Sequence, residues 1–353
     1  MRRTAPAHDC LPRIDLVPAA PEHARMLARS GALVRTWRRA ALVLASSVGA
    51  LLGAEGLLRW LAPAALFVSG RDTEGWTENT PTFDTFMQVD ATIGYLPRRG
   101  TALYDERGLC RDQSADQALP TGPLEVLWLG DSVTARRFIE REVRRQSSTP
   151  FTSRCGGVEG YNTAQTLGYY QRELRSLRPA QVVFTLHHND WWNTPIVFYD
   201  DEGRVHCRTL DRQVGAFSPW WFEHSYLYRA GFSLWLGAGA EHAGAAADRQ
   251  VEQALRGLRD LLAADRVACT VLLLPPMRPE TAWSEAERQR HERARALLTE
   301  LGLEFVDLLP GLRAGLAAGV DPQQLPNDWM HPSEAIAVHL AAEVVRAGVV
   351  PRR

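Results

Sequence analysis

The sequence predicts an α/β fold of the doubly wound type, in which a central parallel sheet is covered by helices on both faces. Near-continuous apolar runs of strand length alternate with helical stretches over most of the chain. This alternation is typical of parallel sheets, because a strand buried on both faces has no polar side. The chain has 353 residues, of which 45% are hydrophobic, so it can form one large globular domain with additional segments.

The N-terminal part predicts a membrane helix. A polar, Arg-bearing segment over 1–39 is followed by the uncharged run AALVLASSVGALLGA. That run is shorter than the roughly 20 residues that cross a bilayer, so a transmembrane signal anchor over 40–61 must include Glu55 and Arg59. Their i, i+4 spacing allows an ion pair. The excess of Arg upstream predicts a cytoplasmic N-terminus and an extracytoplasmic domain. A cleaved signal peptide, which would give a secreted protein, and a soluble amphipathic helix are the alternatives.

The next segment, 62–122, contains Gly, Pro and Thr without sustained periodicity, and we expect a juxtamembrane segment that leads into a domain over 123–353. Strand-like runs in that domain are LEVLWLG, TPFTSRC, QVVFTLH, VACTVLLLP and the shorter LEFVDL. Helices are expected near 135–146, 162–176, 248–264, 284–301 and 333–346.

The alternation stops over 191–247, where the stretches DWWNTPIVFYDD and SPWWFEHSYLYR supply many aromatic side chains. An insertion that follows the carboxyl end of a strand lies above the ligand crevice of a doubly wound fold. We therefore expect either a lid or substrate wall, or aromatics that only pack the insertion onto the body.

Composition excludes several classes of function. The formal net charge is −1 at pH 7 and no basic stripe is present. Nucleic-acid binding is not expected, because phosphate neutralisation dominates that affinity. The five cysteines show neither a C-x-x-C pair nor metal-finger spacing, so neither a metal site nor a cofactor is predicted. No sequence feature indicates the oligomeric state.

Two short stretches together predict a catalytic triad. Ser132 lies in GDS at the end of the first strand of the domain, and DWMHP places Asp328 and His331 in a loop before the last helix. Spaced three residues apart, Asp328 can orient His331, and His331 can take the proton of a Ser132 nucleophile. The alternative role of Ser132 is that of a helix N-cap.

Two further stretches can supply an oxyanion hole. Gly160 in GVEGYNT precedes a helix, and Asn189 in HHND follows a strand. The backbone N–H groups of Ser132 and Gly160 and the side-chain amide of Asn189 would donate to the substrate oxygen. Glycine leaves room for the carbonyl, and asparagine donates without acting as a base. A simple turn glycine and a structural strand-end asparagine are the alternatives.

Taken together, these four stretches resemble the SGNH hydrolases, also called the GDSL esterase and lipase family, over residues 124–350. The resemblance implies a three-layer α/β/α sandwich with a central parallel sheet. The upstream stretch IGYLPRRGTALYDERGLCRDQ looks like the segment that precedes the domain in membrane-anchored members. The sequence departs from the family's motifs at two positions. Val133 replaces the Leu of the GDSL motif, and His187 replaces the Gly of the G-x-N-D motif. A bulky ring is therefore expected near the oxyanion pocket.

The leading hypothesis is a serine ester hydrolase that acts on a small-molecule or glycan acyl ester, with a short acyl chain such as an O-acetyl group. An O-acyltransferase that modifies extracytoplasmic glycans would use the same triad, because the acyl-enzyme is common to both reactions. A non-catalytic, membrane-tethered glycan-binding protein is the alternative from another class.

Overall fold

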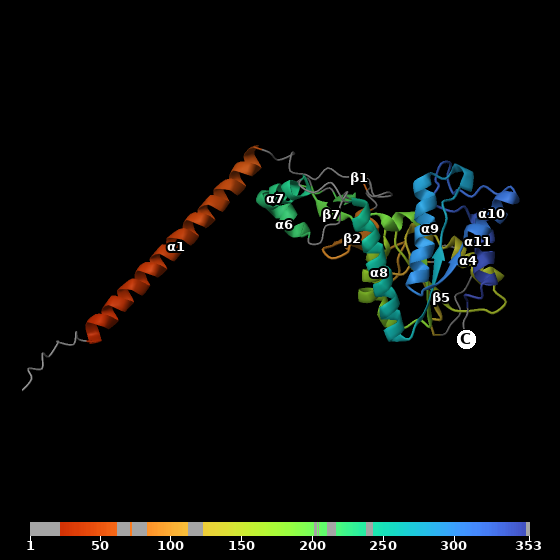
Figure 1. Cartoon of the computed structure of the whole chain (residues 1–353), viewed down its shortest axis with the longest axis horizontal. Coiled ribbons are helices and arrows are strands. Elements are labelled where there is room, and N and C mark those ends of the chain that lie inside the picture. Colours follow the sequence, from red (N-terminus) through yellow and green to blue (C-terminus); the bar gives the residue numbers. More distant parts are fainter. Residues whose placement is uncertain are drawn as a thin grey trace, which may run out of the picture. The chain divides into compact units, whose positions relative to one another are not determined.

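The structure is a computed structural model that describes residues 22–61, 71–72, 83–111, 123–200, 203, 205–209, 217–237 and 243–350 (Figure 1). The chain divides into two compact units, Met1–Pro63 and Ala64–Arg353.

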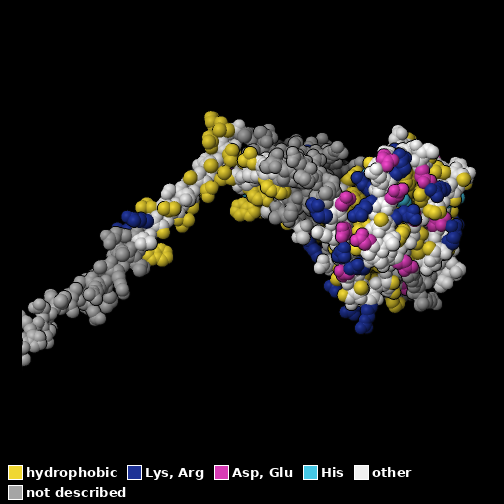
Figure 2. Space-filling model, viewed as in Figure 1, with side chains coloured by type: hydrophobic (Ala, Val, Ile, Leu, Met, Phe, Trp, Pro, Cys, Tyr) yellow, Lys and Arg dark blue, Asp and Glu magenta, His cyan; other side chains and the backbone are white. Residues whose placement is uncertain are grey.

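The first unit contains one long helix, α1 (Glu22–Leu61). Its stretch Thr36–Leu61 is long and apolar enough to cross a membrane, as the helices of signal anchors and signal sequences are, and its most apolar part is not buried against the protein. Figure 2 shows hydrophobic side chains along this stretch. The predicted ion pair is present, with 2.9 Å between Arg59 Nε and Glu55 Oε1. The two charges thus neutralise each other on one face of the helix.

The second unit is built on a five-stranded sheet in which every pairing is parallel. The strand order is β10-β9-β6-β4-β5. The strands are β4 (Val126–Gly130), β5 (Ser153–Gly157), β6 (Gln181–Leu186), β9 (Ala268–Leu273) and β10 (Glu304–Asp307). This confirms the predicted α/β class, and the chain order of the strands shows the crossovers of a doubly wound sheet.

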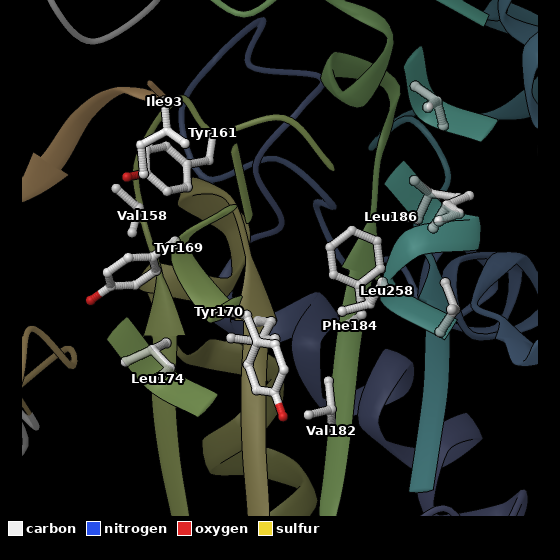
Figure 3. Close-up of a cluster of buried hydrophobic side chains, with 14 of the residues drawn as sticks. Ile93, Val158, Tyr161, Tyr169, Tyr170, Leu174, Val182, Phe184, Leu186 and Leu258 are labelled. Carbon is white, nitrogen blue, oxygen red and sulfur yellow. The ribbon is translucent and has the colours of Figure 1, made fainter. Parts of the chain in front are cut away.

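Helices cover both faces of this sheet. Successive side chains along each strand point to opposite faces, so the apolar strands need a helical layer on each side. Leu127 and Leu129 pack into one core with residues of α5, α8 and α9, and Figure 3 shows part of that cluster. Val126 and Trp128 pack into a second core with residues of α4, α10 and α11. The helices are α3 (Ser132–Ala135), α4 (Phe138–Gln146), α5 (Thr163–Tyr169), α8 (Ala243–Asp265), α9 (Glu285–Glu300), α10 (Leu309–Ala317) and α11 (Glu334–Arg346).

Helix α10 was not predicted, since its Pro and two Gly residues give a low helix propensity. The glycines have a packing role instead. A Cβ at Gly311 would lie 2.7 Å from the carbonyl oxygen of His339, and one at Gly315 would lie 2.1 Å from Ile336 Cδ1. Helix α10 can therefore approach α11 closely only because both positions lack a side chain.

The segment 83–111 packs onto the sheet domain. It forms α2 (Phe83–Phe86) and the antiparallel pair β2 (Met87–Asp90) and β3 (Gly94–Pro97). Phe83, Met87 and Tyr95 are buried in the first core. The Tyr95 hydroxyl donates to the carbonyl of Glu159 at 2.7 Å. The segment that we expected to be only a juxtamembrane connection thus supports the loop that carries Gly160.

The insertion forms a small layer together with the short strand β1 of the preceding segment. Strands β1 (Arg71–Asp72), β8 (Val205–Thr209) and β7 (Ile196–Tyr199) pair antiparallel, and helices α6 (Pro219–His224) and α7 (Tyr226–Gly237) follow. Ile196, Phe198, Phe222 and Phe232 form a separate core. These side chains therefore form a core within the insertion, whereas the two expectations were a lid or aromatics that pack the insertion onto the body.

Candidate active site

The nucleophile candidate lies where β4 ends and α3 begins. Gly130 has φ +150°, and a Cβ there would lie 2.4 Å from Thr134 Oγ1, so only glycine fits this turn. Asp131 is the N-cap of α3, and its carboxylate accepts the N–H of Val133 at 3.0 Å. Ser132 is the first helical residue and is 9% exposed. The N-cap interpretation of Ser132 is therefore wrong, and its hydroxyl is available for another partner.

The structure brings the three predicted triad residues together. Ser132 Oγ lies 2.7 Å from His331 Nε2, and His331 Nδ1 lies 2.9 Å from Asp328 Oδ2. Asp328 Oδ1 also accepts the backbone N–H of His331 at 3.2 Å. This arrangement places the Nδ1 proton on the Asp328 side and leaves Nε2 as the acceptor toward Ser132.

Backbone hydrogen bonds hold the loop that carries Asp328 and His331. The N–H of Gln324 donates to the carbonyl of His331 at 3.0 Å, and the N–H of Met277 donates to the carbonyl of Trp329 at 2.7 Å. The second bond attaches the loop to the segment that follows β9. The imidazole is thus positioned by the sheet as well as by its own loop.

Gly160 lies in a turn that follows β5 and adopts φ +74°, a conformation that favours glycine. The hydrogen bond of this turn runs from the N–H of Tyr161 to the carbonyl of Val158 at 3.2 Å, so it does not use the N–H of Gly160. The Gly160 N–H can therefore serve as a donor to a substrate.

Asn189 lies in the short 3-10 helix η3 (His188–Trp191) after β6. Its Nδ2 donates to Asp131 Oδ2 at 2.7 Å, which ties this side chain to the residue beside Ser132. An amide nitrogen carries two protons, so one remains for a substrate oxygen. The sequence did not assign Asp131 a role, although it stands inside the GDS motif.

A second buried carboxylate, Asp190, joins the loops of the site. It accepts the backbone N–H of His187 at 2.6 Å and the hydroxyl of Thr163 at 2.7 Å. Burial raises the pKa of Asp190 well above its usual value, and the nearby Asp131 carboxylate raises it further. Burial likewise raises the pKa of Asp131. Asp190 thus fixes the segment of Asn189 against the start of α5.

His187 does not open onto solvent. Its ring is 1% exposed, and Nδ1 lies 3.4 Å from the carbonyl oxygen of Leu274. Burial lowers the pKa of His187 to about 3, so the ring is neutral at pH 7. The bulky ring expected at this position is therefore buried at the end of the sheet, where it contacts the segment that follows β9.

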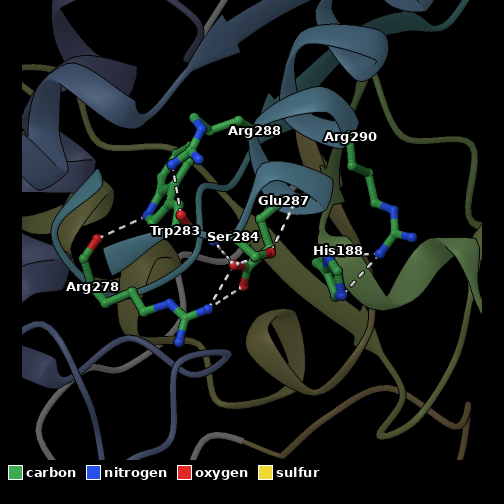
Figure 4. A network of polar contacts seen from close by, with 7 residues as sticks. All are labelled: His188, Arg278, Trp283, Ser284, Glu287, Arg288 and Arg290. Carbon is green, nitrogen blue, oxygen red and sulfur yellow. Dashed lines mark hydrogen bonds and ion pairs between the residues drawn. The ribbon is translucent and has the colours of Figure 1, made fainter. Parts of the chain in front are cut away.

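Figure 4 shows a network of polar contacts that includes His188, Arg278 and Glu287, and the triad loop contacts it through Trp329. The ring of Trp329, between Asp328 and His331 in sequence, contacts the ring of His188 edge-on at 4.8 Å. The Arg278 guanidinium lies 5.4 Å from the centre of the Trp329 ring and forms an ion pair with Glu287 at 2.5 Å. This support has no signal in the sequence, because its members come from three separate segments.

No family model matches the sequence, and no curated protein matches it. The folded domain is similar to several solved structures. One is an acetyl xylan esterase, with a TM-score of 0.41 and 13% sequence identity; the match covers 64% of this chain and 99% of the esterase chain. A catalytic mutant of an acetylxylan esterase from Geobacillus stearothermophilus has a TM-score of 0.40 and 13% identity, covering 65% and 95%. A GDSL-like lipase from Bacteroides thetaiotaomicron has a TM-score of 0.38 and 16% identity, covering 66% and 92%.

These likenesses are too distant to carry the assignment of a function. The site itself consists of a Ser–His–Asp arrangement at the carboxyl ends of parallel strands, which is where doubly wound folds bind their ligands. Among the described residues, no group of three or more His, Cys, Asp or Glu side chains could hold a metal ion.

Proposed function

We propose that the protein is an ester hydrolase in which Ser132 is the nucleophile, His331 the general base and acid, and Asp328 the group that orients His331. The observation that carries this proposal is the continuous chain of hydrogen bonds, with 2.7 Å from Ser132 to His331 and 2.9 Å from His331 to Asp328. Nucleophile and base lie within the reach that proton transfer requires.

The reaction proceeds in two halves. Ser132 Oγ attacks the acyl carbon while its proton passes to His331 Nε2, and the Asp328 carboxylate stabilises the resulting imidazolium. The ester bond then breaks, and the leaving alcohol takes the proton from His331. In the second half, His331 removes a proton from water while the water oxygen attacks the acyl carbon. The bond to Ser132 Oγ then breaks, Ser132 Oγ takes the proton from His331, and the acid leaves.

The N–H groups of Ser132 and Gly160 and the free amide proton of Asn189 stabilise the negative charge on the substrate oxygen. Support comes from the turn of Gly160, which does not use that N–H, and from the 2.7 Å bond that fixes Asn189. The substrate is an acyl ester with a short chain, on a small molecule or a glycan. The domain lies outside the cytoplasm, anchored by the helix over Thr36–Leu61.

Hydrolysis of chromogenic acetyl, butyryl and octanoyl esters by the full chain in nanodiscs tests the proposal. We expect turnover of the short esters, and a loss of at least about 10³-fold in the Ser132→Ala and His331→Ala variants. Ser176→Ala, at an exposed serine of the 3-10 helix η2 (Arg175–Leu177), is the matched control. Activity that survives Ser132→Ala would refute the assignment.

A further inference from the structure

A cleft of about 510 Å³ is lined by residues that neighbour the candidate site residues along the chain. Its walls come from the segments that carry the site. Arg136 follows α3, Glu159 precedes Gly160, and Gln324 donates its N–H to the carbonyl of His331. The remaining wall is formed by residues of the segment 101–111 and the first turns of α4 and α11. The segments that carry the candidate site thus also form walls of this cleft.

Arginines dominate the charge of the cleft, and most of them are already paired. Arg137 forms an ion pair with Glu140 at 2.7 Å, and Arg141 forms one with Glu334 at 3.0 Å. Arg111 donates to the carbonyl of Thr101 at 2.8 Å, and its nearest carboxylate is 3.5 Å away on an exposed glutamate. One further arginine lines the cleft, and its guanidinium has no such partner among the described residues.

That guanidinium belongs to Arg136. Its Nε is buried without a hydrogen-bond partner, and among the described residues no carboxylate lies within ion-pair distance of it. Glu159 lines the same cleft but does not pair with it. Arginine stays protonated in proteins, and a buried donor without a partner costs free energy. An anion that enters the cleft would remove this cost.

The position of Arg136 relative to the nucleophile is fixed by the backbone. Its N–H donates to the carbonyl of Ser132 at 3.1 Å, one helical turn after the nucleophile. Arg136 therefore lies one helical turn after Ser132, and it lines the cleft. A planar guanidinium matches the geometry of a carboxylate and can bind it through two parallel hydrogen bonds.

We propose that this cleft is a subsite for a carboxylate of the substrate, and that Arg136 selects acyl esters of acidic glycans, such as O-acetylated uronic acids. This inference rests on the proposed function and names its substrate class. Arg111 also lines the cleft and adds a second positive charge to the subsite.

The test compares two substrates that differ only in charge: an O-acetylated oligogalacturonide and the same oligosaccharide after reduction of its carboxyl groups. With the full chain in nanodiscs, we expect kcat/KM to be about 10- to 100-fold higher for the acidic substrate, mainly through a lower KM. Equal kcat/KM for the two substrates would overturn the subsite. This comparison uses the wild-type chain, so it does not depend on the folding of a variant.

Arg136→Gln then assigns the preference to one residue. We expect the variant to reduce the ratio of kcat/KM for the acidic and the reduced substrate to near unity. Arg293→Gln, at an exposed arginine of α9, is expected to keep the wild-type ratio. An unchanged ratio in Arg136→Gln would refute the role of this residue.

The outcomes separate this inference from the proposed function. Hydrolysis of a chromogenic acetyl ester without any preference for the acidic glycan would overturn the subsite alone. If none of the esters is hydrolysed in a way that depends on Ser132, both the subsite and the proposed function are overturned. Inorganic phosphate serves as a further probe. If phosphate inhibits hydrolysis of the reduced substrate as strongly as free galacturonate does, the cleft is a general oxyanion site, which would contradict selection of a carboxylate.

Discussion

Gly157, the last residue of β5, lies directly against the backbone of the nucleophile helix. A Cβ at this position would lie 2.4 Å from the nitrogen of Ala135 and 2.8 Å from the carbonyl carbon of Thr134. Both are backbone atoms of α3, so no side-chain rotation can relieve the contact. We therefore expect Gly157→Ala to push α3, and Ser132 with it, away from His331.

The size of the effect follows from these distances. Non-bonded heavy atoms settle near 3.5–4.0 Å, so α3 must move by about 1 Å. A displacement of that size from a productive geometry costs about 100-fold in rate. Overpacking of this kind also lowers the free energy of unfolding by about 1–3 kcal/mol. Gly157 is not among the glycines with positive φ, so the expected loss is steric.

Steady-state hydrolysis of a chromogenic acetyl ester and urea unfolding of the full chain measure the two effects. Gly231→Ala in α7 is the matched control, since a Cβ there would meet nothing within 4 Å. The control is expected to keep its activity and to gain up to about 1 kcal/mol from helix propensity. A Gly157→Ala variant with wild-type activity and stability would refute the close packing of β5 against α3.

Three other substitutions test the site and its support. Asp328→Asn should reduce kcat by about 10³- to 10⁴-fold in ester hydrolysis, because the amide favours the wrong tautomer of His331; a loss below tenfold would contradict this. Burial lowers the pKa of His187 to about 3, so the unfolded chain binds a proton below pH 6.5 that the folded chain does not. Stability should therefore fall as the pH decreases from about 6.5 toward 3, and His187→Gln should reduce that slope by about 1.4 kcal/mol per pH unit in urea unfolding. Equal slopes in the two proteins would show that this ring does not stay neutral. Glu140→Gln should cost about 3–5 kcal/mol of unfolding free energy, because it removes the negative charge from the buried ion pair with Arg137, and a cost below about 1 kcal/mol would exclude a buried pair.

The sheet and most of its helices could be predicted because each element is continuous in the sequence. Strands β4, β6 and β9 are apolar runs, and the ends of β4 and β6 place Ser132 and Asn189 at one edge of the sheet. Asp328 and His331 could be found because their spacing within one loop carries the chemistry. These features are local, so no knowledge of distant contacts was needed.

Other features depend on contacts between distant segments. Asp131 and Ser132 are both good N-caps by residue type, and the turn at the end of β4 decides between them. The segment 83–111 has only short elements, which leave no periodic signal, yet it supplies a wall of the cleft beside Arg136. The sequence shows Arg136 only as one arginine among many. Its missing partner becomes visible when the surrounding segments are in place.

Reaction of the full-length protein with a fluorophosphonate, followed by peptide mass mapping, tests whether Ser132 is an activated nucleophile. We predict a single adduct on the peptide that contains Ser132, and labelling that is slower by at least about 10³-fold in His331→Ala, because the hydroxyl then lacks its base. An adduct on another serine, or no adduct on Ser132 in the wild-type chain, would contradict the assignment of the triad.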